Sequence, residues 1–295
     1  MNRGKNALII SFLAVPLGLY ILFVLLPYAS ALVFAFTRWS GLSANITFNG
    51  FNNFIKLYND EKFWSALSHN GIALLVLPPV IAAIALFFAF IFTQGLKFAR
   101  GFRIAFFFPQ VLSVVIVAVL WGFIYHPTIG LLNAALEAFG FTQMASFPWL
   151  GDRSTVFGSV LAVVIWQSVG FYMVLFVAGM NAIPMDYYEA ARIDGATPWQ
   201  LFWWVTVPLL WDTIRTAIVF LAIGAMDLFA IVTVMTNGTG GPSRAADVAP
   251  VYLYSTAFSD GQFGYATAMG LVLLVLVLGL SIISLRFTAR ESVEY

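Results

Sequence analysis

The sequence predicts an all-α integral membrane protein with six transmembrane helices, and its composition is the first reason. Of its 295 residues, 61% are hydrophobic and 9% are charged, and the mean hydropathy is +0.93. Soluble domains carry about 25% charged residues, so this chain lacks the polar side chains needed to cover a water-facing surface. The net charge of +1 gives no reason to expect nucleic acid as a partner.

Long stretches without charged residues are the second reason. A helix needs about 20 mostly apolar residues to cross a bilayer core of ~30 Å. Runs such as Leu271–Leu280 are continuously apolar, whereas a β-barrel strand alternates apolar and polar residues. The sequence therefore predicts one transmembrane domain over residues 1–295, with helices near 8–36, 71–93, 104–125, 156–180, 208–235 and 263–285.

The first of these helices is expected to stay in the protein. Arg3 and Lys5 resemble the basic start of a signal peptide, and residues 29–31 resemble a cleavage site. However, the apolar stretch before that site exceeds the 7–15 residues of a signal peptide.

The distribution of Lys and Arg predicts the orientation. The termini and the connections 94–103 and 181–207 hold eight Lys/Arg in 53 residues, against five in 90 for the segments 37–69, 126–155 and 236–262. Positive residues concentrate on the cytoplasmic side, so both termini and the 181–207 segment are predicted to be cytoplasmic. The aromatic segment 50–68, on the opposite side, predicts short helices lying at the membrane interface.

The 181–207 segment has the sequence pattern of two short helices rather than of an irregular loop. Asp186 is predicted to cap a helix over 187–193, with Glu189 in the capping-box position. Gly195 predicts a turn, and a second short helix follows over 199–204. The expected product is a helix–turn–helix that projects into the cytosol.

Within this segment, the run from Glu189 to Ala196 (Glu-Ala-Ala-x-x-Asp-Gly-Ala) closely resembles the EAA loop of binding-protein-dependent ABC importer permeases. Further patches in the same order look like the maltose/glycerol-phosphate type of sugar permease. They are Gly50–Phe54, Gly130–Asn133, Pro148–Leu150 and Thr239–Pro242. The resemblance covers roughly residues 50 to 287, and residues 243–247 depart from it.

The resemblance implies a type I importer permease fold and a noncatalytic translocation subunit that moves a sugar or related polyol across a bacterial or archaeal cytoplasmic membrane. The implied partners are a second homologous permease, two ATPase subunits and an extracytoplasmic solute-binding protein. ATP and Mg would be bound by the ATPase subunits, because this chain has no phosphate-binding GxxxxGK[ST] loop. The residues implied to couple to the ATPase are Glu189, Ala190, Ala191, Asp194 and Gly195, and we therefore name residues 181–207 the coupling loop.

Intramembrane polar residues predict a substrate path, because they are costly in lipid and usually face a cavity or another helix. Gln167, Ser168 and Phe171 form one stripe that resembles the sugar-facing stretch of maltose-type permeases, and Gln110 resembles another sugar-facing position. Asp227, within the fifth predicted helix, either pairs with another helix or lines the path. Helix–helix contact is the alternative for Gln110, Gln167 and Ser168.

Two other function classes compete. An ion-coupled secondary transporter would need an ion-coupling carboxylate and inverted repeats, and only Asp227 fits that alternative. An intramembrane enzyme would need a reaction centre. The two histidines, His69 and His126, are far apart in the sequence and are expected to have interfacial roles.

Overall fold

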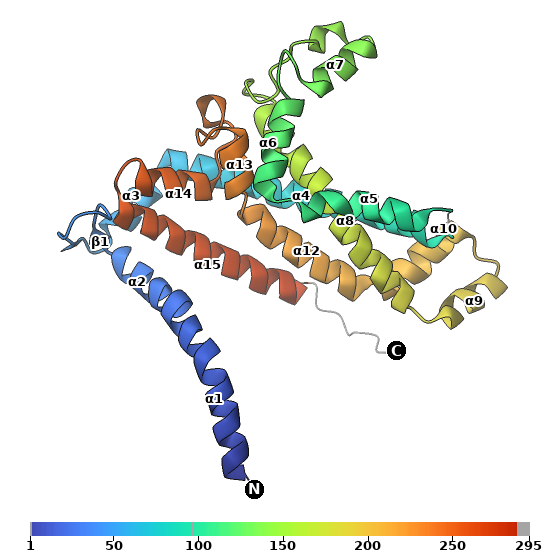
Figure 1. Cartoon of the computed structure of the whole chain (residues 1–295), viewed down its shortest axis with the longest axis horizontal. Helices are drawn as coiled ribbons and strands as arrows, with labels where there is room; N and C mark the ends of the chain where they lie inside the picture. Colours follow the sequence, from blue (N-terminus) through green and yellow to red (C-terminus); the bar gives the residue numbers. More distant parts are fainter. Residues whose placement is uncertain (1, 96, 288–295) are drawn as a thin grey trace. The chain divides into compact units, whose positions relative to one another are not determined.

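The chain is described by a computed structural model that covers residues 2–95 and 97–287 (Figure 1). In that part, four helices are long and apolar enough to cross a membrane: Ser11–Phe34, Glu61–Thr93, Val156–Ala182 and Phe263–Ile283. Two further pairs of helices, bent by 100° and 70°, raise the number to six if each bent pair is one span. These helices agree with the predicted α-helical membrane fold.

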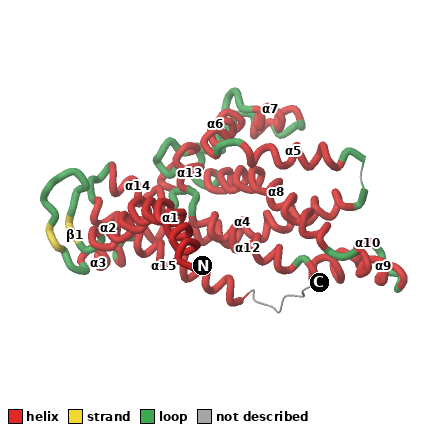
Figure 2. The backbone as a smooth tube through the Cα atoms, turned by 60° about the horizontal axis from the view of Figure 1, so that its bottom comes forward, coloured by secondary structure: helices red, strands yellow, loops and turns green. Residues whose placement is uncertain are grey.

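The chain divides into two compact units, and the first comprises Met1–Phe63 and Tyr252–Leu276. Its strands β1 and β2 pair antiparallel, with Thr37 opposite Phe48, and Figure 2 shows them as short yellow segments of the tube. A β-carbon at Gly264 would lie 2.2 Å from the Thr37 carbonyl oxygen, so glycine permits this close approach. The elements are α1 (Asn2–Tyr20), the π-helix η1 (Ile21–Leu25), α2 (Leu26–Phe34), β1 (Thr37–Arg38), β2 (Thr47–Phe48), α3 (Asn52–Tyr58), the end of α14 (Ala249–Phe258) and most of α15 (Phe263–Phe287).

The second unit comprises Trp64–Val251 and Val277–Tyr295, and it contains every predicted site residue. Figure 1 places α9 at one end of α8 and α7 beyond the other end. Its elements are most of α4 (Glu61–Thr93), α5 (Ala99–Val111), α6 (Val114–Ile124), α7 (Leu131–Ala138), η2 (Thr142–Met144), α8 (Val156–Ala182), α9 (Met185–Ile193), α10 (Pro198–Leu201), the π-helix η3 (Phe202–Thr206), α11 (Val207–Leu209), α12 (Trp211–Met226), α13 (Phe229–Met235) and η4 (Pro242–Arg244).

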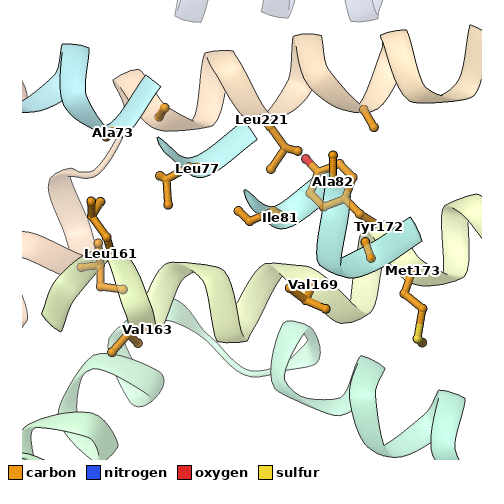
Figure 3. Packing of buried hydrophobic residues seen from close by; sticks show 14 of the residues in the cluster. Ala73, Leu77, Ile81, Ala82, Leu161, Val163, Val169, Tyr172, Met173 and Leu221 are labelled. Atoms are coloured by element: carbon orange, nitrogen blue, oxygen red, sulfur yellow. The ribbon is translucent and has the colours of Figure 1, made fainter. Parts of the chain in front are cut away.

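The core of the second unit lies where α4, α8 and α12 pack together. Figure 3 shows Leu77 and Ile81 of α4 pointing into the space between α8 and α12, and both are at most 2% exposed. Small residues allow the helices to approach closely, as is usual in membranes. A β-carbon at Gly170 of α8 would lie 1.8 Å from the Phe106 carbonyl oxygen of α5.

Three of the predicted helices differ from the structure. The second starts ten residues early, at Glu61, so only α3 is a separate short helix in the 50–68 segment. The third is broken at Leu112 and Ser113, which are extended, and its halves meet at 100°. The fifth breaks at Leu210 and again at Asp227. Both π-helices directly precede a proline-containing turn, Pro27 or Pro208, where a missing N–H shifts the hydrogen-bond ladder.

Candidate functional site

The predicted coupling loop is a helix–turn–helix, as expected. Helix α9 ends at Ile193, and Gly195 has φ = +81°, the left-handed conformation that glycine adopts without strain. The Gly195 N–H donates to the Arg192 carbonyl and the Ala196 N–H to the Ala191 carbonyl, both at 3.0 Å. This pair of bonds is a Schellman motif, which satisfies the last carbonyls of the helix from its own backbone.

The start of each short helix differs from the prediction. The capping role predicted for Asp186 is wrong, because Pro184 is the N-cap of α9 and Asp186 lies in its first turn. A capping box does occur before the second helix, where Thr197 and Gln200 exchange hydrogen bonds. The sequence Thr-Pro-Trp-Gln carries that signature, so the signal for this cap was present but unused.

The five predicted coupling residues lie together on this short segment. Glu189, Ala190, Asp194 and Gly195 are exposed, and Ala191 is half-buried. Next to them the side chain of Ile193 is 86% exposed. A short helix that presents two carboxylates, small residues and an exposed Ile has the composition of a docking surface for another protein.

Side-chain contacts connect α9 to η3 and η3 to α4. The Tyr188 hydroxyl lies 3.2 Å from the hydroxyl of buried Thr206 in η3. The Phe90 ring of α4 packs against Phe202, with centroids 4.7 Å apart. A cavity of about 660 Å³ lies beside these contacts and is also lined by Arg192. Sequence reasoning missed Tyr188 and Thr206, because neither lies in the Glu-Ala-Ala or Asp-Gly runs.

A second cavity, of about 320 Å³, lies among α4, α8, α12 and α13. Three of the five residues predicted for the substrate path line it: Gln167, Ser168 and Asp227. Residues from α4, including Leu77, add apolar surface. The cavity therefore combines an amide, a hydroxyl and a carboxylate with apolar walls, which are the groups that hold a polyhydroxylated ligand.

The other two predicted path residues lie elsewhere. Gln110 is exposed near the end of α5, and Phe171 is 42% exposed with its ring edge-on to Tyr172. Gln167 itself donates to the Leu112 carbonyl at 3.3 Å, at the break between α5 and α6. Gln167 therefore makes the helix contact of one interpretation and also lines the cavity in which the other interpretation would place a substrate.

Asp227 lies at a helix break rather than within a helix. Helix α12 ends at Met226, and α13 begins at Phe229. The amide of Asn70 in α4, fully buried, donates to the carbonyls of Ala225 and Met226 at 3.1 and 3.3 Å. Irregular backbone at membrane depth needs such internal partners. Asn70 was missed because no local pattern links it to a break some 155 residues later.

Comparison with known families agrees with this arrangement. The family described as "Binding-protein-dependent transport system inner membrane component" matches residues 71–292, which include the coupling loop and the cavity. The chain belongs to this family. The match makes it a permease of binding-protein-dependent transport and favours that class over the ion-coupled secondary transporter.

Curated relatives agree with the family along nearly the whole permease. A diacetylchitobiose uptake system permease of Streptomyces coelicolor is 37% identical, over 91% of this chain and 78% of the relative. A probable ABC transporter permease of Bacillus subtilis is 36% identical, over 98% and 99%. A multiple sugar-binding transport system permease of Streptococcus mutans is 30% identical, over 96% of each.

Solved structures agree in fold. A chain from the crystal structure of a bacterial ABC transporter that imports the acidic polysaccharide alginate superposes with a TM-score of 0.84, at 22% identity, over 99% of the permease and 98% of that chain. A chain from the same kind of transporter in complex with an alginate pentasaccharide-bound periplasmic protein gives 0.83, also at 22% identity, over 99% and 97%. The permease therefore has the ABC importer fold.

The loop over residues 237–247 has a strained backbone that the sequence did not predict. Asn237, Ser243 and Arg244 all have positive φ, which is uncommon outside glycine and clusters at functional sites. Buried Asp247 follows them and accepts from Arg244 at 3.1 Å. Burial raises the pKa of Asp247 above its ordinary value, although Arg244 and His69 oppose the change. This is the region where the sequence departs from the sugar-permease pattern.

Proposed function

We propose that this permease moves a sugar or related polyol across a bacterial or archaeal cytoplasmic membrane, as one of two homologous permeases that share a path. Two ATPase subunits would bind ATP and Mg and drive this transport, and an extracytoplasmic solute-binding protein would supply the sugar. The observation that carries the proposal is the family match, which includes an exposed helix–turn–helix. The sugar class is supported by the names of relatives that take up diacetylchitobiose or multiple sugars.

In this proposal the coupling loop is the ATPase contact. Closure of the ATPase dimer would push α9 as a rigid body, because its turn is closed by its own backbone. The push would pass through the Tyr188–Thr206 contact into η3 and α12. The other end of α12 reaches the cavity at Asp227, so a movement of the loop would change the cavity.

The cavity is the proposed substrate contact of this subunit. Gln167, Ser168 and Asp227 supply hydrogen-bonding groups to sugar hydroxyls, and the apolar walls face the ring. Gln110 and Phe171 keep their proposed roles only if the second permease completes the path beside them. The chain itself holds no ATP site in this proposal.

Orientation can be tested because the chain contains no cysteine. Single cysteines at Ser43 and at Thr197 should react with an impermeant maleimide from opposite sides of right-side-out vesicles. The proposal, with both termini cytoplasmic, expects Ser43→Cys to be labelled in intact vesicles and Thr197→Cys only after permeabilisation. The reverse pattern would contradict the orientation.

The function is tested by reconstituting the four-subunit complex in liposomes and measuring uptake of labelled sugars. We expect uptake that requires ATP and the binding protein and that persists when ionophores collapse ion gradients. Uptake that stops with the ion gradient and ignores ATP would overturn the proposal. The permease purified alone should hydrolyse no ATP above a mock preparation.

A variant of Glu189 tests the contact with the ATPase separately from the delivery of sugar by the binding protein. Glu189→Gln should remove a charge-assisted contact to the ATPase, a class worth about 1.5–3 kcal/mol. We expect weaker ATPase retention and reduced binding-protein-stimulated hydrolysis, with unchanged docking of the binding protein. Glu137→Gln, a glutamate in α7 outside the coupling loop, is the control and should behave as wild type. Wild-type retention in Glu189→Gln would remove this residue from the interface.

A further inference from the structure

A polar cavity of about 620 Å³ opens in the first unit beside the β1–β2 ribbon, and its volume is in the range of small-molecule sites. Thirteen of its fourteen lining residues carry a hydrogen-bonding side chain, in a chain that is 61% hydrophobic. Four of the eleven asparagines in the sequence are among them: Asn45, Asn49, Asn52 and Asn53. The side chains of Asn49, Asn52 and Asn53 hydrogen-bond to one another or to the backbone of this unit, whereas that of Asn45 has no such partner among the described residues and is available to a ligand.

The walls of this cavity are fixed by contacts within the same unit. The buried amide of Asn53 donates to the carbonyls of Ala35 and Thr37, at 2.8 and 2.9 Å. The indole N–H of Trp39 donates to the Ser43 carbonyl at 2.8 Å, which fixes the ring beside the cavity. A site whose polar groups are already held in place loses little entropy when a ligand binds.

The cavity offers more hydrogen-bond donors than acceptors. The Arg38 guanidinium is exposed, with no hydrogen bond or ion pair among the described residues. The Lys56 ammonium donates to the Gln262 side-chain oxygen, which leaves the amide N–H groups of Gln262 available, and lies 3.9 Å from the centroid of the Tyr265 ring. None of the fourteen lining residues is Asp or Glu. The two positive charges therefore have no carboxylate partner inside the cavity.

We propose that this cavity binds a saccharide unit that bears a carboxylate. The forked guanidinium of Arg38 suits a carboxylate, and the amides of Asn45 and Gln262 suit ring hydroxyls. The choice of a saccharide rests on the proposed function, whereas the carboxylate follows from the unpaired charges of Arg38 and Lys56. The site is separate from the cavity at Gln167, since the lining residues of the two belong to different units.

The test uses the full chain in lipid nanodiscs and two matched probes, digalacturonate and its neutral counterpart galactobiose, in isothermal titration. Wild type should bind digalacturonate at least tenfold more tightly than galactobiose. Arg38→Gln should weaken digalacturonate binding by about tenfold or more, in line with a charge-assisted hydrogen bond, and should leave galactobiose binding nearly unchanged. Asn45→Ala should weaken both severalfold.

A control variant locates the binding. Arg153→Gln, an exposed arginine in the second unit, should bind digalacturonate as wild type does. Equal affinity for both probes, no binding to wild type, or unchanged binding in Arg38→Gln and Asn45→Ala would overturn the inference. ATP-driven sugar uptake by the complex is measured separately: uptake without this binding defeats the inference alone, and binding without such uptake defeats the proposed function.

Discussion

The turn at Gly195 and the helix break at Asp227 both interrupt helices of the second unit, but they are stabilised in opposite ways. At Gly195 the freed carbonyls are satisfied by N–H groups two and three residues past the helix end at Ile193, those of Gly195 and Ala196. At Asp227 the carbonyls of Ala225 and Met226 are satisfied by Asn70, some 155 residues earlier in the chain. The first interruption is local and exposed, and the second depends on a buried side chain from another helix.

This difference separates an element that acts as a unit from an element that is part of the packing. A turn closed by its own backbone can be displaced as a rigid body, as docking to another protein requires. A break closed by a distant side chain keeps its shape only while α4 and α12 stay together. The break between α5 and α6 belongs to the second kind, because Gln167 of α8 satisfies the Leu112 carbonyl.

The largest expected effect follows from the distant bond at Asp227. Asn70→Leu removes the Asn70 donor from the buried Ala225 carbonyl and from the half-buried Met226 carbonyl. It also leaves the Ala249 N–H, which donates to the Asn70 side chain at 2.9 Å, without this acceptor. Each buried group left unpaired costs about 1–3 kcal/mol, so we expect a loss of several kcal/mol in stability. The measurement is thermal unfolding of the purified chain in nanodiscs. Asn181→Leu, an exposed asparagine, is the control, and equal unfolding temperatures for the two variants would contradict the role of Asn70.

The next effect concerns the local turn. Gly195→Val forces a branched side chain into a left-handed conformation, at a cost of about 1–2 kcal/mol. We expect the rest of the fold to persist, because the turn is closed by its own backbone and no other element depends on it. We also expect ATPase retention and binding-protein-stimulated ATP hydrolysis to fall. Asn tolerates this conformation better than Val, so Gly195→Asn should recover much of the coupling.

Gly158→Val is the control for the turn, because Gly158 lies in α8 with normal φ and with open space around its β-carbon position. It should couple as wild type does. A stable Gly195→Val variant that also couples normally would show that the geometry of this turn does not matter for the ATPase contact.

The same distinction explains what the sequence could predict. The coupling loop was predicted from adjacent residues, because Gly195 and the Glu-Ala-Ala run act through their own neighbours. The ends of the helices at Leu112 and Asp227 were not predicted, because the residues that permit these breaks, Gln167 and Asn70, lie on other helices. Hydropathy averages over a window of residues, so it joins two short helices across a break that holds a single polar residue, as at Ser113 or Asp227.

The substrate-path prediction was limited for a related reason. Gln167, Ser168 and Asp227 face one cavity, and their polarity in an apolar stretch was a sufficient signal. Phe171 lies one turn from Gln167 in a stretch that resembles the sugar-facing stretch of maltose-type permeases, but neither helical spacing nor this resemblance says where a cavity ends. Gln110 was included by resemblance, and its exposed side chain would need a contact from another subunit.

A smaller effect sharpens the comparison at Gln167, which both lines the cavity and closes a break. Gln167→Ala removes one neutral hydrogen bond to Leu112, typically worth about 0.5–1.5 kcal/mol. We expect sugar uptake per assembled complex to fall severalfold, with a small fall in unfolding temperature. Gln110→Leu, at an exposed position, should alter uptake without changing that temperature. If Gln167→Ala prevents assembly while uptake by the remaining complex is normal, its role is helix contact alone.

Asp60, which lies just before α4, combines the local and the distant mode in one carboxylate. One oxygen accepts from the backbone N–H groups of Lys62 and Phe63, at 3.1 and 3.3 Å. The other accepts from the hydroxyls of Tyr252 and Tyr265, at 2.9 and 2.5 Å. Burial alone would raise the pKa of Asp60, but these hydrogen bonds, led by that from Tyr265, together lower the pKa below its ordinary value.

The smallest expected effect is therefore a dependence of stability on acid pH. A carboxylate whose pKa is lower in the folded chain stabilises the fold above the ordinary Asp value of 3.8, and this contribution is lost as pH falls through the folded pKa. The unfolding temperature of wild type should fall below about pH 4, and that of Asp60→Asn should fall less over the same range. Tyr252→Phe removes one distant bond but leaves the local bonds from Lys62 and Phe63, so it should give an intermediate pH dependence. Identical pH profiles for all three chains would mean that the carboxylate is satisfied as well in the unfolded chain, and that the distant tyrosines add nothing to the local cap.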